Sequence, residues 1–572
     1  MTSRPGVARA EVIRPTLVAM LASWLALTLT GHPVAAQDTA HASVFDSTPA
    51  IAVIPRPAQI APLAGHFTLT SRTTIWTDPA HADARTVGRQ LARYLEPATG
   101  FALAVRPGAP PATADAIVLR LDASLARLGP EGYVLDVRPD RVTARAAGAA
   151  GLFYAVQTIR QLLPPDVFRA APVRDVAWTM PAVRIEDTPR FAWRGAMLDV
   201  GRHFMPKEFV EKYVDLLALH KMNVFHWHLT EDQGWRLEIR KYPRLTSVGA
   251  QRAMTIAGRQ VRGDSARWVY DSVPHGGFYT QDDAREVVAY AAARHVTVVP
   301  EIEMPGHAVA AIAAYPELGV SGGPTAVATR WGVFDNILNA EPATVGFMQD
   351  VLTEVLAIFP STYIHVGGDE ADKTRWKADP RIQARIRALG LKDEHELQSW
   401  FIGQTDTFLT RHGRRLIGWD EILEGGLAPN AAVMSWRGTA GGIAAARAGH
   451  DVVMTPTSHV YLDYYQSRDQ AAEPLAGGGY LPLDTVYAFE PVPAELSAGE
   501  ARHILGAQGN LWTEYVPTPK QAEYMAFPRL SALAEVTWTP RAGRDFADFR
   551  ERLRTHLRRL DALDVHYRPL RP

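Results

Sequence analysis

The stretch with the clearest chemical potential is 365–371, which reads His-Val-Gly-Gly-Asp-Glu-Ala. Its glycines, Gly367 and Gly368, let the backbone turn sharply and approach a ligand closely. The carboxyl groups of Asp369 and Glu370 then project into one cleft, where each raises the pKa of the other, so we expect one to stay neutral near pH 7. A neutral carboxylic acid beside a sugar linkage can protonate the leaving oxygen. Alternatively, Asp369 only caps the next helix and Glu370 is merely exposed.

More carboxylates, histidines and aromatic residues follow other short apolar runs of the sequence. Few lysines and no phosphate-cradling loop accompany them, which is typical of a sugar-binding site. The 14 tryptophans suit such a site, because aromatic faces pack against the apolar faces of sugar rings. The candidates are Asp199, Arg202, His203, His226, His228, Glu231, Asp232, Glu301, Glu303, His307, His365, Trp419, Asp420, Glu421, Trp436, Arg437, Tyr461, Asp463, Trp512 and Glu514.

The elements that must position these side chains recur in a regular rhythm from about residue 190. A short apolar run, a polar or glycine-containing turn and a helical stretch alternate, which predicts a (β/α)8 TIM barrel with its chemistry at the carboxyl ends of the strands. A doubly wound open sheet is the alternative, but no glycine-rich dinucleotide fingerprint follows any run. The segment 252–277 is long enough for a lid or a disordered loop. The runs are 195–200, 223–228, 296–303, 363–367, 415–418, 432–435, 451–455 and 504–511.

The sequence predicts a small α/β (α+β) domain over residues 37–185, before the catalytic barrel of 186–540. Alternating residues at 133–137 and 141–144, with Pro139 and Asp140 between them, indicate a hairpin. Helical spacing at 87–95 and 152–163 predicts helices on one face of its sheet. Residues 541–572 predict a C-terminal helix packed on the barrel, with apolar positions from Phe546 to Leu560.

Composition excludes several classes of protein. The chain has 572 residues, room for up to about four domains, and is 47% hydrophobic and 21% charged, which argues against disorder, collagen and a membrane bundle. Its net charge of -1 provides no global field for nucleic acid or an acidic membrane face. It contains no cysteine, which excludes disulfides, thiolate metal sites, cysteine nucleophiles and a lipid anchor on cysteine.

The amino terminus has the features of a secretory signal peptide over residues 1–36. Arg4, Arg9 and Arg14 precede an uncharged run over 16–30, and Val34-Ala35-Ala36 offers a small-residue cleavage site before Gln37. The run is shorter than the about 20 residues that a membrane span needs. We therefore expect a periplasmic or secreted protein with no membrane attachment after cleavage; an uncleaved anchor helix is the alternative.

Together these motifs resemble family 20 of the glycoside hydrolases, the β-N-acetylhexosaminidases. The resemblance covers about 185–540, and the preceding segment is similar to the family's small amino-terminal domain. Nine short motifs occur in the family's order, which makes the match specific. They are Arg-Gly-Ala-Met-Leu-Asp-Val-Gly-Arg-His-Phe at 194–204, His-Trp-His at 226–228, Asp-Gln-Gly-Trp at 232–235, Pro-Glu-Ile-Glu-Met-Pro-Gly-His at 300–307, His-Val-Gly-Gly-Asp-Glu at 365–370, Gly-Trp-Asp-Glu at 418–421, Ser-Trp-Arg-Gly at 435–438, Tyr-Leu-Asp at 461–463 and Leu-Trp-Thr-Glu at 511–514.

The resemblance implies an exo-acting retaining hydrolase of terminal, non-reducing β-linked N-acetylhexosamine. An ordinary retaining glycosidase needs a second carboxylate as nucleophile, about 5 Å from the acid. In this family the substrate's acetamido oxygen attacks instead and forms an oxazolinium ion, with the kinetic advantage of an intramolecular reaction. By resemblance, Glu370 protonates the leaving oxygen and then deprotonates water, Asp369 holds the acetamido N–H, and Tyr461 donates its hydroxyl to the acetamido oxygen.

The same resemblance implies binding and supporting roles for eight further residues, and a small carbohydrate substrate without cofactor or metal. Trp419, Trp436 and Trp512 would wall the pocket. Arg202, Asp463 and Glu514 would bind sugar hydroxyls, while Asp232 and His307 would support the acid.

Two other functions are weighed against this one. In a metal-dependent barrel hydrolase, His226 and His228 would bind a metal together with His307, His365 and Asp369, but a metal does not explain the adjacent Asp and Glu. A non-catalytic sugar-binding protein would have lost one carboxyl of the pair, and both are present. The choice between N-acetylglucosamine and N-acetylgalactosamine, the natural substrate (chitin oligomer, peptidoglycan fragment or glycan) and the oligomeric state stay open.

Overall fold

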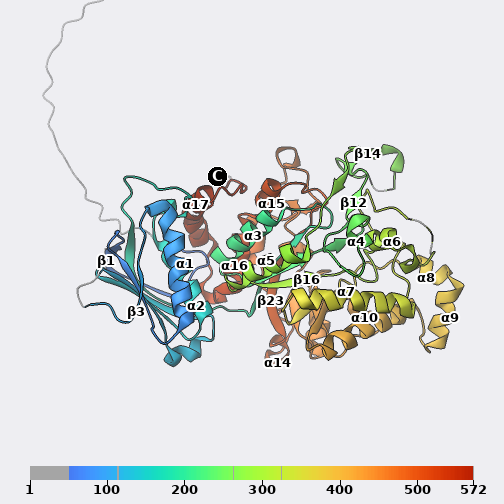
Figure 1. Ribbon diagram of the computed structural model, residues 1–572, viewed down its shortest axis with the longest axis horizontal. Helices are drawn as coiled ribbons and strands as arrows, with labels where there is room; N and C mark the ends of the chain where they lie inside the picture. The colour runs from blue at the N-terminus through green and yellow to red at the C-terminus, as the bar shows by residue number, and fades with distance from the viewer. Residues whose placement is uncertain (1–50, 112–114, 262, 322, 324, 571–572) are drawn as a thin grey trace, which may run out of the picture. The chain divides into compact units, whose positions relative to one another are not determined.

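The computed structural model describes residues 51–111, 115–261, 263–321, 323 and 325–570 (Figure 1). The expected signal peptide and its cleavage site therefore lie outside the described residues. Among the described residues, no helix is long and apolar enough to cross a membrane.

A mixed seven-stranded sheet comes first in the chain. Helices α1 (Ala82–Thr99) and α2 (Ala149–Leu162) pack against each other and against this sheet, so both lie on one face of it (Figure 1). The expected hairpin is present, because Arg138 pairs with Arg141 across a two-residue turn. In sheet order the strands are β1 (Gln59–Thr68), β7 (Thr179–Asp187), β5 (Tyr133–Arg138), β6 (Arg141–Ala146), β4 (Ala116–Leu121), β2 (Thr74–Thr77) and β3 (Val105–Pro107).

The second part of the chain forms a closed barrel of eight parallel strands, which confirms the predicted fold and rules out an open doubly wound sheet. The chain closes the ring by pairing its last barrel strand with its first, Leu511 opposite Leu198. Around the ring the strands are β16 (Thr297–Glu301), β17 (Tyr363–His365), β18 (Arg415–Trp419), β19 (Ala432–Ser435), β20 (Val452–Met454), β23 (Ile504–Leu511), β8 (Trp193–Asp199) and β9 (Val224–His228). All eight overlap the predicted apolar runs.

Amphipathic helices between the strands cover the barrel. Helix α5 illustrates their start signals, because Thr280 and Asp283 form a reciprocal capping box at its first turn. Inside the ring, Met197, Val299, Ile417 and Met434 belong to a separate apolar cluster of strand residues. These helices include α3 (Lys207–Leu219), α5 (Gln281–Ala292), α7 (Pro342–Ile358), α10 (Glu394–Arg411), α11 (Ala440–Arg447) and α16 (Arg529–Trp538).

Shorter elements extend the loops around the barrel. The segment 252–277 was expected to be a lid or a disordered loop. Its described residues pair with each other and with a flank through β12 (Gln251–Arg252), β13 (Ile256–Ala257), β14 (Val269–Tyr270) and β15 (His275–Gly276), which argues against disorder. The other short elements are β10 (Thr230–Glu231), β11 (Gly234–Trp235), β21 (Tyr464–Tyr465), β22 (Gly478–Tyr480), α4 (Arg244–Ser247), α6 (Val309–Ala314), α8 (Thr374–Ala378), α9 (Pro380–Ala388), α12 (Thr457–Val460), α13 (Leu483–Ala488), α14 (Ala498–Ala501) and α15 (Pro519–Ala526).

The chain ends in helix α17 (Phe546–Ala562), which Asp545 caps by accepting from the Asp548 amide. Its buried face includes Leu553 and Arg552, whose guanidinium pairs with Glu535 of α16 at 2.7 Å. The helix therefore contacts α16 of the barrel's outer layer.

Candidate active site

A cavity of about 820 Å³ opens where the barrel strands end. It gathers ten of the eleven site residues expected from the sequence, although they are spread over more than three hundred positions. The remaining one, Asp232, lies behind the wall, where its carboxylate is 3.1 Å from Nδ1 of His307. The ten are Arg202, His307, Asp369, Glu370, Trp419, Trp436, Tyr461, Asp463, Trp512 and Glu514.

The turn after β17 presents the two adjacent carboxyl groups to this cavity. Gly367 has φ +65°, and a Cβ there would lie 1.7 Å from Oε2 of Glu303, so only glycine fits. Glu370 itself has φ +46°, in the left-handed region that non-glycine residues rarely adopt. Such strain at a cleft is typical of a functional residue held in place by its surroundings.

His307 links the carboxyl pair to a buried acidic pair behind it. Its Nε2 lies 3.5 Å from both Asp369 Oδ2 and Glu370 Oε2, while Nδ1 lies 2.8 Å from Glu231 Oε1 and 3.1 Å from Asp232. Burial opposes the charged imidazole, but the surrounding carboxylates outweigh it and hold the pKa of His307 well above its ordinary value. His307 is therefore a fixed cation between two pairs of acids.

The proton distribution on the carboxyl pair differs from the expectation. Burial raises the pKa of Asp369 to about 6. The interaction with His307 lowers the pKa of Glu370, whose side chain is 40% exposed. The two pKa values are therefore split, as expected for adjacent carboxyl groups, but the raised value, about 6, belongs to Asp369, while that of Glu370 is lowered. The His307 cation is the physical reason.

The polar part of the cavity contains buried atoms without a hydrogen-bond partner. They include Nε of Arg202, Oδ1 of Asp369 and Oδ1 of Asp463. Buried polar atoms are rarely left unpaired in proteins, so these atoms point to a ligand rich in hydroxyl groups. Arg202 is held for this task by Glu231, 3.0 Å from Nη2, and by Arg252, which donates to the Arg202 carbonyl at 2.7 Å.

An aromatic wall completes the cavity. The rings of Trp419 and Trp512 lie 5.7 Å apart, Tyr461 lies 6.3 Å from Trp512, and Trp436 stacks on Tyr461 at 6.2 Å. Burial, together with the charge of Asp463, raises the pKa of the Tyr461 hydroxyl well above its ordinary value, so it remains a donor. The three tryptophans thus line the cavity, and Trp419 also belongs to the apolar cluster inside the barrel, against which the other two pack.

Two carboxylates hold the tryptophans of this wall from behind. Trp419 Nε1 donates to Glu301 at 2.8 Å, and Trp436 Nε1 donates to Glu421 at 2.9 Å. Glu301 is buried and surrounded by three imidazoles, those of His226, His228 and His365, at 3.0, 2.5 and 2.8 Å. These histidines do not line the cavity, and their ring nitrogens are directed to Glu301 behind its wall.

Other residues of the cavity wall were not anticipated from the sequence. They come from the segment 252–277, from the loop at 330–333 and from the residue after Glu514. No periodic pattern or strand end marks them, although the length of the first segment was a signal. They include Arg259, Gln260, Trp268, Arg330, Trp331 and Tyr515.

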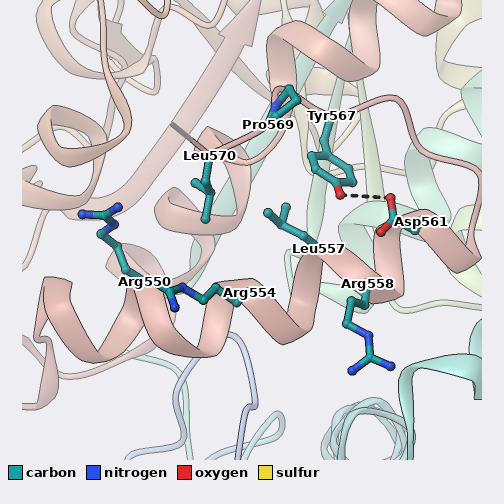
Figure 2. Close-up of a pocket in the computed structure, with 8 residues that line it drawn as sticks. All are labelled: Arg550, Arg554, Leu557, Arg558, Asp561, Tyr567, Pro569 and Leu570. Atoms are coloured by element: carbon teal, nitrogen blue, oxygen red, sulfur yellow. Dashed lines mark hydrogen bonds between the residues drawn. The ribbon is translucent and has the colours of Figure 1, made fainter. Parts of the chain in front are cut away.

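A second cavity, of about 380 Å³, lies along α17 (Figure 2). Tyr567 donates to Asp561 at 2.9 Å at one end, and three arginines lie along the helix. Among the described residues that line it, Asp561 has the one carboxyl group, and no paired acid and base is present. The lining residues are Arg550, Arg554, Leu557, Arg558, Asp561, Tyr567, Pro569 and Leu570.

Comparison with known proteins agrees with this geometry. Residues 191–541 match the family model "Glycosyl hydrolase family 20, catalytic domain", and residues 50–188 match "Glycosyl hydrolase family 20, domain 2". A beta-hexosaminidase of Porphyromonas gingivalis is 47% identical over 90% of this chain, which spans 64% of that protein's length. A beta-N-acetylhexosaminidase of Cellulomonas fimi is 35% identical, with 89% of this chain and 94% of that protein covered.

Solved structures show the same fold. The family 20 beta-N-acetylhexosaminidase of Streptomyces coelicolor A3(2) superposes with a TM-score of 0.79 at 36% identity, covering 91% of this chain and 98% of that one. A mutant beta-hexosaminidase of Streptomyces plicatus in complex with product (GlcNAc) has the same TM-score at 35% identity, covering 91% and 97%. With the closed barrel, the carboxyl pair and the aromatic wall in place, this chain belongs to glycosyl hydrolase family 20.

Proposed function

We propose that this protein is an exo-acting retaining β-N-acetylhexosaminidase that removes terminal, non-reducing β-linked N-acetylglucosamine or N-acetylgalactosamine. One observation carries the proposal: an adjacent Asp and Glu meet an aromatic wall and unpaired polar atoms in one cavity. The GlcNAc complex of the Streptomyces plicatus relative supports the same class of ligand.

In the first step, the acetamido oxygen of the substrate attacks the anomeric carbon while the bond to the leaving oxygen breaks. Glu370 gives its proton to that oxygen, and an oxazolinium ion forms, with its positive charge against ionised Asp369. In the second step, water attacks the anomeric carbon, Glu370 takes its proton, and the acetamide is restored. Two inversions at one carbon retain the β configuration.

Substrate binding must move the proton that Asp369 and Glu370 share onto Glu370 before the first step. In the protein alone, the pKa order places a single proton on Asp369. A bound sugar covers Glu370, which raises its pKa, while the acetamido N–H donates to Asp369 and favours its ionised form. The proton therefore moves from Asp369 to Glu370 as the substrate binds.

The other carboxyl groups of the cavity suit binding better than nucleophilic attack. Burial and mutual repulsion raise the pKa of Asp463 well above its ordinary value, and burial raises that of Glu514. A carboxyl group whose charged form is disfavoured by burial is a weaker nucleophile, and it remains a good partner for hydroxyl groups. We assign Asp463 and Glu514, with Arg202, to the hydroxyls of the terminal sugar.

The remaining assignments follow from the cavity wall. Tyr461 donates to the acetamido oxygen, and Trp419, Trp436 and Trp512 enclose the acetyl methyl group and the sugar face. His307 and Asp232 support the acid from behind, through the contacts described above.

The proposal is tested by hydrolysis of 4-nitrophenyl β-N-acetylglucosaminide and β-N-acetylgalactosaminide, with 4-nitrophenyl β-glucoside as control. We expect turnover of one or both acetamido substrates and almost none of the glucoside, which lacks the attacking oxygen. Equal cleavage of the glucoside would contradict the mechanism, and cleavage of none would contradict the activity.

We also propose that residues 1–36 direct export and that the mature protein is periplasmic or secreted. The basic head, the short apolar run and the small-residue site support this. The division into 37–185, 186–540 and 541–572 is proposed with it, supported by the ranges of the two family matches. The mass of the exported protein checks the cleavage: a first residue other than Gln37, or an intact amino terminus, would refute the site.

A further inference from the structure

A third cavity, of about 250 Å³, lies toward the end of the barrel at which the strands begin, away from the candidate active site. Its barrel side comes mainly from the second half of α3, the helix that leads into the start of β9. Helices α1 and α2 of the amino-terminal sheet domain and the short helix η2 (Pro165–Phe168) form the other walls. The cavity therefore lies between the amino-terminal domain and the barrel.

The wall of this cavity contains a buried arginine, Arg160, in the last turn of α2. It is 9% exposed, and its guanidinium carbon lies 4.0 and 4.5 Å from the ring centres of Tyr94 and Phe168. Nη1 donates to Oε1 of Gln157 at 2.7 Å. Neither the buried Nε nor Nη2 has an acceptor among the described residues. One edge of the guanidinium is therefore unpaired.

The charge of Arg160 has no counter-charge in contact with it. Among the described residues, no carboxylate oxygen lies within 4.0 Å of its nitrogens. Asp215 lines the cavity but is engaged elsewhere, because Arg294 pairs with its Oδ1 and Tyr290 donates to its Oδ2 at 2.7 Å. Burial lowers the pKa of Arg160, and the charge of Asp215 offsets this only in part. Unlike an exposed arginine, Arg160 has lost its solvation by water, and stacking on aromatic rings returns only part of it.

The rest of the lining is apolar or already satisfied. Arg169 and Lys212 pair with carboxylates, and Arg93 is exposed to water. These cations therefore do not call for a ligand, whereas Arg160 does. The apolar lining residues include Pro97, Val167, Leu216, Leu219 and Leu563.

We propose that this cavity binds a small amphipathic carboxylate, with its oxygens on the unpaired edge of Arg160 and its apolar body against the cavity walls. Two N–H groups on one edge of a guanidinium match the two oxygens of a carboxylate. The volume is just below the about 300–1,000 Å³ of pockets for drug-sized ligands, so the ligand is a smaller molecule. A molecule bound there contacts both the amino-terminal domain and the barrel, and so stabilises the folded protein.

The test is the binding of two small carboxylates, benzoate and hexanoate, to the full protein. Each is compared with its uncharged amide, benzamide or hexanamide, and Kd is measured by ligand-observed NMR titration. With an affinity per non-hydrogen atom between those of very small and drug-sized ligands, we expect a Kd of about 1 mM for at least one carboxylate. Its amide should bind about tenfold more weakly or worse, because hydrogen bonds between charged groups are the stronger ones.

Two variants assign the binding to this cavity. Arg160→Gln removes the cation and should weaken carboxylate binding about tenfold, to the level of the amide. Ala170→Trp leaves Arg160 in place but adds a large side chain at an exposed position of the lining, so it should block the carboxylate and the amide alike. Ala126→Trp, at an exposed alanine outside the lining, is the matched control and should bind as the wild type does. A saturating carboxylate should also raise the melting temperature of the wild type but not that of Ala170→Trp.

Three results would overturn this inference. They are the absence of carboxylate binding by the wild type, equal affinities for a carboxylate and its amide, and undiminished carboxylate binding by either cavity variant. If Arg160→Gln does not fold, Ala170→Trp still decides, because it does not alter Arg160. Hydrolysis of acetamido substrates is a separate measurement, so this inference and the proposed function can fail independently.

Discussion

Replacing His307 by glutamine should move the pH dependence of the reaction upward. In the protein alone, the pair of Asp369 and Glu370 holds one proton between the lowered pKa of Glu370 and the pKa of Asp369, about 6. Catalysis needs this one proton, so kcat/KM should fall above about pH 6, where the pair has lost it. Removing the His307 cation makes the ionised pair less stable, so the proton is kept to higher pH.

The size of the shift follows from the geometry. His307 Nε2 is 3.5 Å from Asp369 Oδ2. At that distance and an effective dielectric constant of about 20, a unit charge contributes about 5 kcal/mol. Glu231 and Asp232 offset part of the imidazolium charge from the other side, at 2.8 and 3.1 Å. We therefore expect a shift of about one to two pKa units, or about 1.4–2.8 kcal/mol.

The assay is kcat/KM for 4-nitrophenyl β-N-acetylglucosaminide between pH 4 and 9. The high-pH decline of the wild type should have its midpoint near the pKa of Asp369, about 6, and that of His307→Gln should lie about one to two units higher. His81→Gln, at an exposed histidine of the amino-terminal domain, should leave the midpoint unchanged. An unmoved or lowered midpoint in a His307→Gln protein that unfolds at the wild-type temperature would refute the reasoning.

Three further substitutions test other parts of the site. Glu370→Gln should lower kcat by about 10²–10⁴-fold, the usual value of a positioned general acid, and near-normal turnover would remove Glu370 from that role. Asp369→Asn should be similarly damaging, because the oxazolinium ion loses its counter-charge; a wild-type kcat would contradict this assignment. Gly367→Ala should destabilise the protein by about 1–3 kcal/mol or more, since its Cβ collides with Glu303, and an unchanged melting temperature would show that the turn can relax.

Much of the fold could be predicted because the barrel repeats one simple pattern. Each apolar run, such as 432–435, forms a strand buried on both sides, and the polar residues after it lie at the same end of the ring. The hairpin at Pro139 and Asp140 could also be predicted, because its turn residues and the alternation of its strands specify it without long-range contacts. The paired strands of the segment 252–277 could not be predicted, because each has only two residues, too few to show an alternating pattern.

The residues that line the site could largely be predicted from the sequence, but the pKa values of its carboxyl groups could not. Adjacent Asp369 and Glu370 suggested mutual repulsion, whereas their protonation depends on His307, more than sixty residues earlier in the chain. The carboxylates that accept hydrogen bonds from the tryptophans of the aromatic wall could not be predicted for the same reason. Glu301 was a candidate at a strand end, yet only the folded barrel shows that it accepts from Trp419.

Participation of the substrate's own acetamido oxygen can be measured with a series of 4-nitrophenyl glycosides whose acetyl group carries zero, one, two or three fluorine atoms. Each fluorine withdraws electrons from the carbonyl oxygen and makes it a weaker nucleophile, while the rest of the sugar is unchanged. If that oxygen attacks the anomeric carbon, kcat should fall steeply and steadily along the series. Equal kcat values for all four substrates would mean that another group attacks.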